Sequence, residues 1–242
     1  MIIYGINAVH EALDSEVKVK RVYVADRMDS RIRAIIESAK EKDVKVVRKD
    51  KEFFRDIKAK AVQYVAAEVD LKPVPFEELF EAGSEVPGIY LVLDQVEDPR
   101  NLGAIIRSAA ASGVSGIVIQ SRRSCGLTSA VFSASAGAVA HVRVSEVPNI
   151  KNAIRVFKDE DYQIIGTDSS GTQPCWEVDY TVNTVFVMGS EGKGLRKTVR
   201  ELCDIVVKIP MDIRVSSINV SVATGVLLYE VLRQKNLEKP AR

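Results

Sequence analysis

The amino-acid sequence predicts an α/β protein in which a small N-terminal unit precedes a larger unit built on a parallel sheet. Three observations lead to this fold class. The chain of 242 residues is long enough for two modest cores. From residue 89 onward, short apolar runs alternate with stretches of helical periodicity, which is typical of parallel strands covered by helices. Paired prolines and glycines without an apolar period mark a linker between residues 72 and 88.

The first unit, residues 1–72, is expected to be a compact α/β domain. Apolar residues recur at helical spacing between residues 32 and 39, after Ser30, a residue type that often caps a helix. The strand-like runs are 21–25, 44–47 and 63–69. Lys and Arg slightly outnumber Asp and Glu in this unit, within a whole chain of net charge +1. This balance is compatible with a polyanionic partner and equally with an ordinary solvated surface.

The linker is placed at residues 73–87 and the second unit at residues 88–242. The expected strands of the second unit are 89–93, 116–119, 142–144, 163–166, 185–188 and 205–209. Parallel strands end at the same edge of a sheet, where folds of this class commonly bind their ligands. Residues that directly follow these strands are therefore the first candidates for a functional site.

Composition excludes several classes of protein. No apolar run reaches the ~18 residues that a membrane span needs, and the N-terminus lacks the basic start and apolar core of a signal peptide. A cytoplasmic protein without membrane contact is therefore expected. The three cysteines lie far apart and the chain has two histidines, so the sequence suggests neither disulfides nor a zinc site.

The first motif that carries chemistry follows the strand at 89–93 and reads D-P-R-N-L-G-A-I-I-R from Asp98 to Arg107. Asp98 and Pro99 suit the N-cap and the first position of a helix. The apolar residues of this helix form a buried stripe, and helical spacing places Arg107 on the opposite side, one turn after Gly103. A glycine there is expected to leave open surface beside the guanidinium, which suits a phosphate or another planar anion.

The second motif is a glycine-rich turn, G-S-E-G-K-G from Gly189 to Gly194, between a buried strand and a helix. Such a turn can bring backbone close to a nucleotide-like ligand. It is not a phosphate-binding loop, because that motif aligned on Lys193 needs glycine in place of Val187 and a hydroxyl residue in place of Gly194. Glu191 would also repel phosphate, so a cationic or hydroxyl-bearing ligand fits better.

The third motif runs from Ile209 to Ser221, again between a strand and a helix. Ser217 is a candidate for the N-cap of that helix. Asn219 and Ser221 are poor choices for a helix interior, because their side chains compete for backbone hydrogen bonds. Polar residues at this place in an otherwise apolar helix indicate a ligand site.

Together, the three motifs closely resemble those of the SpoU family of RNA 2′-O-ribose methyltransferases, within the knotted SPOUT class. The family pattern reads approximately D-P-x-N-x-G-A-x-x-R, then G-x-E-x-x-G, then P-M-x-x-x-x-S-L-N-V-S-V-A. This chain has each in that order, with one more residue between Met211 and Ser217 than this third pattern. Ile218 stands where leucine is usual, which is a volume-conserving change.

The N-terminal unit carries a second resemblance. Residues 3–12 are similar to the start of the small ribosomal-protein-like RNA-binding domain of the bacterial subfamily that modifies large-subunit ribosomal RNA. Residues 61–65 depart from the His-Gln-Gly-Val stretch of that subfamily. Because of this departure, the resemblance does not fix the exact position in the RNA that is modified.

The resemblance implies an S-adenosylmethionine-dependent enzyme that methylates a ribose 2′-hydroxyl in RNA, with a guanosine of 23S ribosomal RNA as the expected substrate. It also implies a trefoil knot in the C-terminal domain, a homodimer and no metal. The residues that match the active-site set of the family are Asn101, Arg107, Glu191, Ser217 and Asn219. The residues expected to bind the cofactor are Thr167, Gly189, Gly194, Ile209, Met211 and Ile218.

Arg107 is the residue whose role the chemistry constrains most. An arginine is too basic to lose its proton at neutral pH. Its expected role is therefore a clamp that holds the substrate phosphate and ribose in place, with removal of the hydroxyl proton relayed through that phosphate. The family proposal that this arginine drives activation of the hydroxyl is compatible with such a relay.

Other readings of the sequence stay open or are disfavoured. Transfer RNA could replace ribosomal RNA as the substrate. A catalytically silent RNA-binding assembly factor on the same fold would have decayed motifs, whereas all five active-site matches are present. A nucleotide-dependent oxidoreductase or phosphotransferase would carry a G-x-G-x-x-G motif or a phosphate-binding loop, and the sequence has neither.

Overall fold

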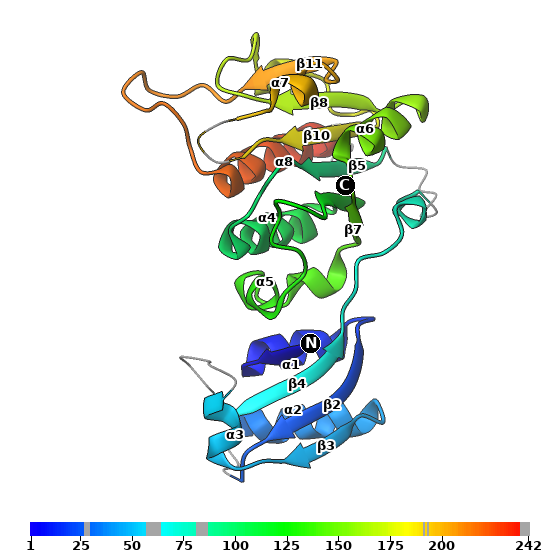
Figure 1. The fold of residues 1–242 in the computed structure, drawn as a ribbon, viewed down its shortest axis with the longest axis vertical. Helices are drawn as coiled ribbons and strands as arrows, with labels where there is room; N and C mark the ends of the chain where they lie inside the picture. Colours follow the sequence, from blue (N-terminus) through cyan, green and yellow to red (C-terminus); the bar gives the residue numbers. More distant parts are fainter. Residues whose placement is uncertain (27–29, 57–63, 81–86, 191, 193, 238–242) are drawn as a thin grey trace. The chain divides into compact units, whose positions relative to one another are not determined.

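The computed structural model groups the chain into two compact units (Figure 1). The residues that it describes are 1–26, 30–56, 64–80, 87–190, 192 and 194–237. The first unit contains Met1–Lys72 and Leu127–His141, and the second contains Pro73–Gly126 and Val142–Arg242. The α/β fold class predicted from the sequence is confirmed, with a mixed sheet in the first unit and a parallel sheet in the second.

The first unit is built on a four-stranded sheet with the order β1-β4-β2-β3. Strand β4 pairs antiparallel with both of its neighbours, whereas β2 and β3 are parallel. The strands are β1 (Ile2–Tyr4), β2 (Lys18–Val24), β3 (Lys45–Arg48) and β4 (Val65–Asp70), and the helices are α1 (Ile6–Asp14), α2 (Ser30–Glu41) and α3 (Lys51–Asp56). The sequence predicted β2, β3 and β4 to within a few residues, although Gln63 of the third expected strand lies outside the described residues.

A distant segment of the chain completes the first unit. It contains α5 (Ser129–Ala134) and the short 3₁₀ helix Ala138–His141. Helix α5 packs on β1, and its Val131 and Phe132 side chains are fully buried. This segment falls within the range 88–242 that the sequence predicted for the second unit. It groups with the first unit instead because its apolar side chains pack there, a tertiary contact that has no local sequence signal.

The second unit is built on a seven-stranded sheet with the order β7-β6-β5-β10-β8-β11-β9, in which every neighbouring pair is parallel. Its strands are β5 (Ile89–Leu93), β6 (Gly116–Gln120), β7 (Val144–Val147), β8 (Gln163–Thr167), β9 (Gln173–Pro174), β10 (Thr184–Met188) and β11 (Ile205–Lys208). The central strands β5 and β10 are buried along their whole length, so their side chains form the middle of the core. The sequence predicted β5, β6, β8, β10 and β11 to within a residue, whereas β7 begins at the last residue of the expected strand 142–144. It did not predict β9, which is too short to show a period.

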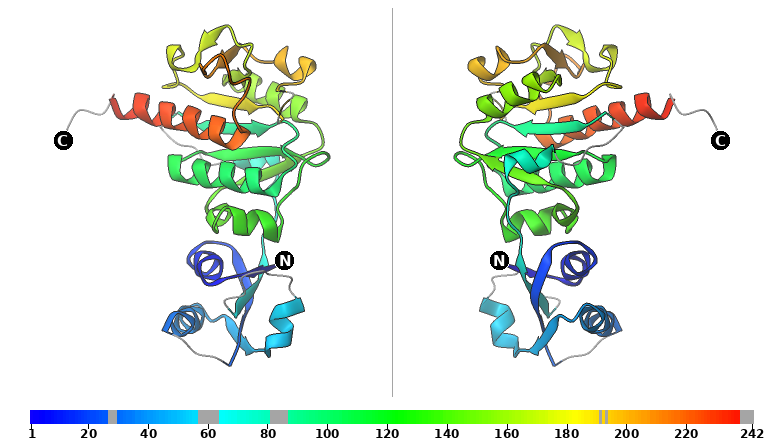
Figure 2. Two further views of the ribbon diagram at one scale, coloured as in Figure 1. Left: turned by 90° about the vertical axis from the view of Figure 1, so that its left-hand side faces the viewer. Right: turned by 90° about the vertical axis from the view of Figure 1, so that its right-hand side faces the viewer.

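The helices of the second unit are α4 (Pro99–Ser112), α6 (Ile150–Asp159), α7 (Lys197–Arg200) and α8 (Val220–Leu237), with short 3₁₀ helices at Phe76–Leu79 and Cys175–Glu177. Helix α6 packs on β5, β6 and β8. Helices α4 and α8 lie side by side (Figure 2). Their contact matters for the site, because α4 carries the first predicted motif and α8 carries the end of the third.

None of the helices in the described part of the chain is long and apolar enough to cross a membrane. The same residues contain no group of three or more His, Cys, Asp or Glu side chains arranged to hold a metal ion. The three cysteines, Cys125, Cys175 and Cys203, are all free thiols.

Candidate functional site

The first motif folds as its sequence predicts at the start of α4. Asp98 occupies the N-cap, where its Oδ1 accepts a hydrogen bond of 2.8 Å from the backbone N–H of Arg100, and Pro99 takes the first helical position. Arg107 is exposed, on the side of the helix opposite the buried stripe. Gly103, however, is buried. It therefore does not leave the open surface that helical spacing suggested, because a residue without a side chain allows close packing around it, and α4 packs along α8.

The third motif meets the first through a pair of asparagines. Asn219 Nδ2 donates a hydrogen bond of 3.0 Å to Asn101 Oδ1. Asn219 Oδ1 accepts from the backbone N–H of Ser221 at 2.9 Å and from its hydroxyl at 2.6 Å. Asn219 thus caps α8, and Ser217, the N-cap candidate from sequence, lies in the loop before it. The two helix starts are held together at the edge of the sheet where the strands end.

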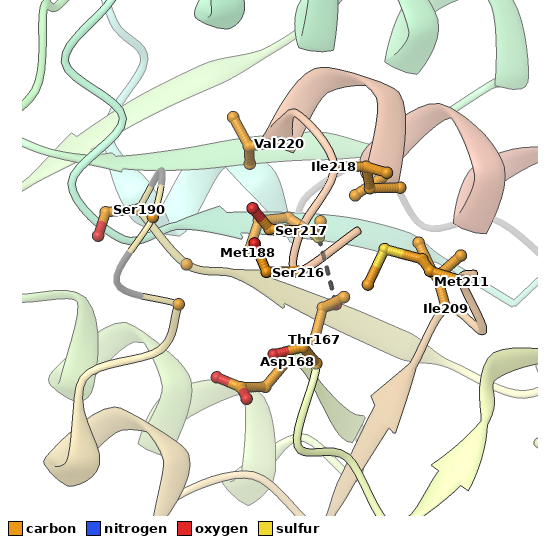
Figure 3. Close-up of a pocket in the computed structure, with 15 residues that line it drawn as sticks. Thr167, Asp168, Met188, Ser190, Ile209, Met211, Ser216, Ser217, Ile218 and Val220 are labelled. Carbon is orange, nitrogen blue, oxygen red and sulfur yellow. Dashed lines mark hydrogen bonds between the residues drawn. The ribbon is translucent and has the colours of Figure 1, made fainter. Parts of the chain in front are cut away.

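A cavity of about 260 Å³ lies next to Asn219, whose chain neighbours Ile218 and Val220 line it (Figure 3). Its walls come from the residues that follow β8, β10 and β11 and from the start of α8. Seven predicted site residues line it: Thr167, Gly189, Gly194, Ile209, Met211, Ser217 and Ile218. Glu191 lies outside the described residues. Arg107 and Asn101 of α4 do not line the cavity. The predicted site residues therefore divide into a set that lines the pocket and these two side chains outside it.

The glycine-rich turn after β10 forms the rim of the cavity. Ser190 and Gly194 pair across it, with two backbone hydrogen bonds of 3.2 Å. Gly194 has a φ of 62°, in the left-handed region that favours glycine. Gly189 permits the close approach of the two sides, since a Cβ on it would lie 2.3 Å from the carbonyl carbon of Gly194. The glycines are therefore required by the geometry of the turn.

Asp168 is a residue of the cavity that the sequence analysis did not identify. Its Oδ1 accepts hydrogen bonds from the backbone N–H and the hydroxyl of Ser170, at 2.9 and 2.6 Å, and its Oδ2 accepts from the Leu195 N–H at 3.3 Å. Burial alone would raise the pKa of Asp168, but these hydrogen bonds and the charge of Arg200 outweigh burial and lower the pKa. The available signal was its position directly after β8, at the edge where ligands bind.

The lining of the cavity combines an apolar and a polar part. Apolar side chains come from Met188, Ile209, Met211 and Ile218, and Thr167 donates to the Met188 sulfur at 3.4 Å (Figure 3). Backbone and side-chain polar groups come from the turn at Gly189–Gly194, from Asp168 and from Ser216 and Ser217. Such a pocket suits a small ligand with a flat apolar ring and polar or cationic substituents.

Comparison with known protein families assigns both parts of the chain. Residues 88–229 match the SpoU rRNA methylase family, and residues 2–75 match the family of RNA 2′-O ribose methyltransferase substrate-binding domains. A relative in Bacillus subtilis, YacO, bears the name of a TrmH family tRNA/rRNA methyltransferase. It is 36% identical over 238 residues, which cover 97% of this chain and 96% of YacO.

Solved structures share the fold. The SpoU methyltransferase AviRb from Streptomyces viridochromogenes, in complex with AdoMet, superposes with a TM-score of 0.87 at 21% identity, over 99% of this chain and 91% of AviRb. An AdoMet-bound rRNA methyltransferase from Sinorhizobium meliloti gives a TM-score of 0.80 at 24% identity, over 96% of this chain and 86% of that protein. The matches along nearly the whole length show that this chain belongs to the SpoU/TrmH family of RNA 2′-O-methyltransferases.

Proposed function

We propose that the cavity binds S-adenosylmethionine and that Asn101 and Arg107 of α4 hold the RNA ribose beside it. The observation that carries the proposal is the convergence of the three motifs. Residues of the second and third motifs line one pocket, and Asn101 of the first motif and Asn219 of the third join the two helix starts at 3.0 Å. Both solved relatives described above contain AdoMet. A cofactor with a purine ring, a ribose and a charged amino-acid tail matches the mixed lining of the pocket.

In this proposal the pocket residues divide by chemistry. The apolar side chains of Ile209, Met211 and Ile218 flank the adenine, and the backbone at Gly189 and Gly194 contacts the rest of the cofactor. The Asp168 carboxylate faces the same space and suits a hydroxyl or ammonium group. Thr167 supplies a further polar contact at the end of β8.

When bound, the cofactor supplies an electrophilic methyl group on a sulfonium. The protein then has to hold the ribose oxygen in line with that methyl at near-attack distance. Asn101, Asn219 and Ser217 offer hydrogen-bonding groups at the mouth of the pocket, and Glu191 belongs to the same set by its place in the motif. Arg107 clamps the phosphate and ribose of the substrate from α4. The proton of the 2′-hydroxyl leaves through the substrate phosphate as the new oxygen–carbon bond forms and the sulfur–carbon bond breaks.

The proposed substrate is a guanosine of 23S ribosomal RNA, recognised through the unit at residues 1–72, with residues 73–87 as the linker to the methyltransferase domain at 88–242. Support comes from the match of residues 2–75 to a substrate-binding family and from the N-terminal resemblance described above. The relatives carry names that include both transfer and ribosomal RNA. Transfer RNA is therefore the alternative substrate.

A homodimer formed through α8 and a trefoil knot in the methyltransferase domain complete the proposal. Val226 and Tyr229 project from α8 with 41% and 60% of their surface exposed, which is unusual for large apolar side chains. A second copy of the chain related by two-fold symmetry would cover this face.

The experiment that tests the substrate uses RNA from cells that lack this gene. Purified protein and methyl-labelled S-adenosylmethionine are incubated separately with the ribosomal and the transfer RNA, and the modified positions are mapped. We expect label in 23S ribosomal RNA at a single guanosine. Label confined to transfer RNA would overturn the substrate assignment while leaving the class of reaction intact.

A further inference from the structure

The rim of the cavity is tied to the rest of the sheet by Asp94, a residue outside the sets named so far. Asp94 directly follows β5, and only 1% of its side chain is exposed. A buried carboxylate is costly unless it is paired. Its partner is Arg196, whose Nε donates to Asp94 Oδ2 at 2.9 Å. Arg196 Nη2 lies 2.7 Å from Asp94 Oδ1, at an angle too poor for a hydrogen bond, so this second contact is coulombic.

The position of Asp94 gives this ion pair a function. Its backbone N–H donates at 2.8 Å to the carbonyl of Met188, the last residue before the glycine-rich turn. Its side chain holds Arg196, the first residue after Leu195 at the other end of the turn. The residue that follows β5 therefore holds Met188 and Arg196, which flank the described rim residues Gly189, Ser190, Gly192 and Gly194.

Two further features hold this arrangement in place. Arg196 Nη2 also donates to Gln120 Oε1, at 3.2 Å, so the guanidinium joins the ends of β5 and β6. Gln95, which follows Asp94, has a φ of 64°. A left-handed conformation is uncommon for residues other than glycine and persists where surrounding contacts enforce it. The fork of an arginine is needed here, because a lysine could not contact both partners with separate donors in a fixed plane.

We propose that Asp94 and Arg196 are positioning residues that keep Gly189, Ser190 and Gly194 in place at the rim of the cofactor pocket. Neither residue lines the pocket. Their loss is therefore expected to weaken S-adenosylmethionine binding and to leave the chemical step, once cofactor is saturating, nearly unchanged. The inference rests on the proposed placement of the cofactor in this cavity.

The test compares Asp94→Asn with Asp204→Asn in the full-length protein. Asp204 is the matched control, because it also pairs with a cation, Lys158 at 2.6 Å, and accepts from the backbone of Ile164 at 2.8 Å. It precedes β11 and so lies at the opposite edge of the sheet from the cavity. Calorimetry gives the Kd for S-adenosylmethionine, and steady-state assays separate the KM for cofactor, the KM for RNA and kcat.

We expect Asp94→Asn to raise the Kd and the KM for cofactor by about 10-fold, the size typical of coupled groups in contact. The KM for RNA and kcat at saturating cofactor should stay within about 3-fold, and Asp204→Asn should bind cofactor normally. Backbone amides of Ser190 and Gly194 should exchange faster with solvent in Asp94→Asn. Arg196→Lys keeps the charge but not the forked guanidinium. Its Kd for cofactor should lie between those of the wild type and Arg196→Met.

A folded Asp94→Asn that binds cofactor within 2-fold of the wild type would overturn the inference, as would an equal loss in Asp204→Asn. If Asp94→Asn does not fold, the two substitutions at Arg196, which is 34% exposed, give the same comparison. A Ser217→Trp variant, which fills the mouth of the cavity, separates this inference from the proposed function. If it binds cofactor normally, the cavity is not the cofactor site and both proposals fail. If Ser217→Trp loses cofactor binding while Asp94→Asn keeps it, only the role of Asp94 is refuted.

Discussion

At the scale of single residues, Arg107 shows how a side chain is kept available for a substrate. It lies on α4 away from the buried stripe, so the fold does not require it, and its guanidinium is exposed. Arg107→Lys keeps the charge but loses the planar set of donors that can grip a phosphate.

We therefore expect Arg107→Lys to reduce turnover nearly as much as Arg107→Ala, on the order of 100-fold, because misplacing the reacting atoms slows the chemical step. Cofactor affinity and Tm should change little. Single-turnover methyl transfer and calorimetry on the same preparations provide the check. Near-normal transfer by Arg107→Lys would show that simple charge suffices and would remove the clamp from the mechanism.

The glycine-rich turn gives a second comparison at this scale. In Gly189→Ala the new methyl group would collide with the backbone of Gly194, so the rim must open and cofactor binding should fall by 10-fold or more. Gly113, at the C-cap of α4 and outside the cavity, is the matched control: its φ of 70° makes alanine unfavourable by about 1 kcal/mol, but a Cβ there meets nothing within 4 Å. Gly113→Ala should thus lower Tm slightly and keep cofactor affinity. Equal affinities in the two variants would show that the close approach at Gly189 does not shape the site.

Single residues also mark where sequence reasoning ended. The cap at Asp98 was predictable because N-capping is local. The candidate Ser217 for the cap of α8 was wrong, since Asn219 caps that helix and also donates to Asn101. Asp168 was missed although it directly follows β8, and its contact with Leu195 joins residues 27 apart in the chain. The Asp94–Arg196 pair joins residues 102 apart. Local patterns cannot show such contacts.

At the scale of elements, α8 has two roles: it packs in the core beside α4, and its first turn contributes to the site. Its buried side is part of the core next to α4, and its other side exposes Val226 and Tyr229. Its start, at the Asn219 cap, joins the site. A partner copy on the exposed side would therefore be held close to the catalytic groups.

We expect Val226→Glu and Tyr229→Glu to convert the proposed dimer to a monomer, because a buried unpaired charge at an interface is strongly unfavourable. The stability of the monomer fold should change by less than about 0.5 kcal/mol, since both sites are exposed within one chain. Light scattering measures the mass in solution. Val156→Glu on α6, a residue with 39% exposure, is the matched control and should stay dimeric. A wild-type protein that is monomeric and active would refute this part of the proposal.

The sequence was most informative about elements in the methyltransferase unit. Strands β5, β6 and β10 are fully or nearly fully buried, and their apolar runs gave correct positions. Strands β1 and β9 have three and two residues, which is too few for a period to appear. Their pairing depends on the strands beside them.

At the scale of the whole molecule, the chain joins a unit that matches RNA substrate-binding domains to a unit that matches methylases. The division is not a simple cut at one point. Leu127–His141 lie within the methylase match but pack in the first unit, so a deletion of residues 1–72 would expose Phe132 and its neighbours.

We expect a deletion of residues 1–72 to keep cofactor binding and to weaken RNA binding by 10-fold or more, provided that Val131 and Phe132 are also replaced by serine. The replacement matters because exposed apolar surface promotes aggregation. Full-length protein with the same two serines is the control. RNA titrations at several salt concentrations would also show fewer phosphate contacts in the truncated form, as a smaller salt dependence. Unchanged activity on the native RNA would contradict this division of roles.

The chemistry of the product tests the central claim most directly. RNA methylated by the purified protein with labelled S-adenosylmethionine is hydrolysed in alkali, which cleaves each phosphodiester through attack by the neighbouring 2′-hydroxyl. A 2′-O-methyl group blocks that attack, so we expect the label in alkali-resistant dinucleotides. Arg107→Ala protein should place label there on the order of 100-fold more slowly. Label released as mononucleotides with methylated bases would show that the site modifies bases and would contradict the ribose assignment.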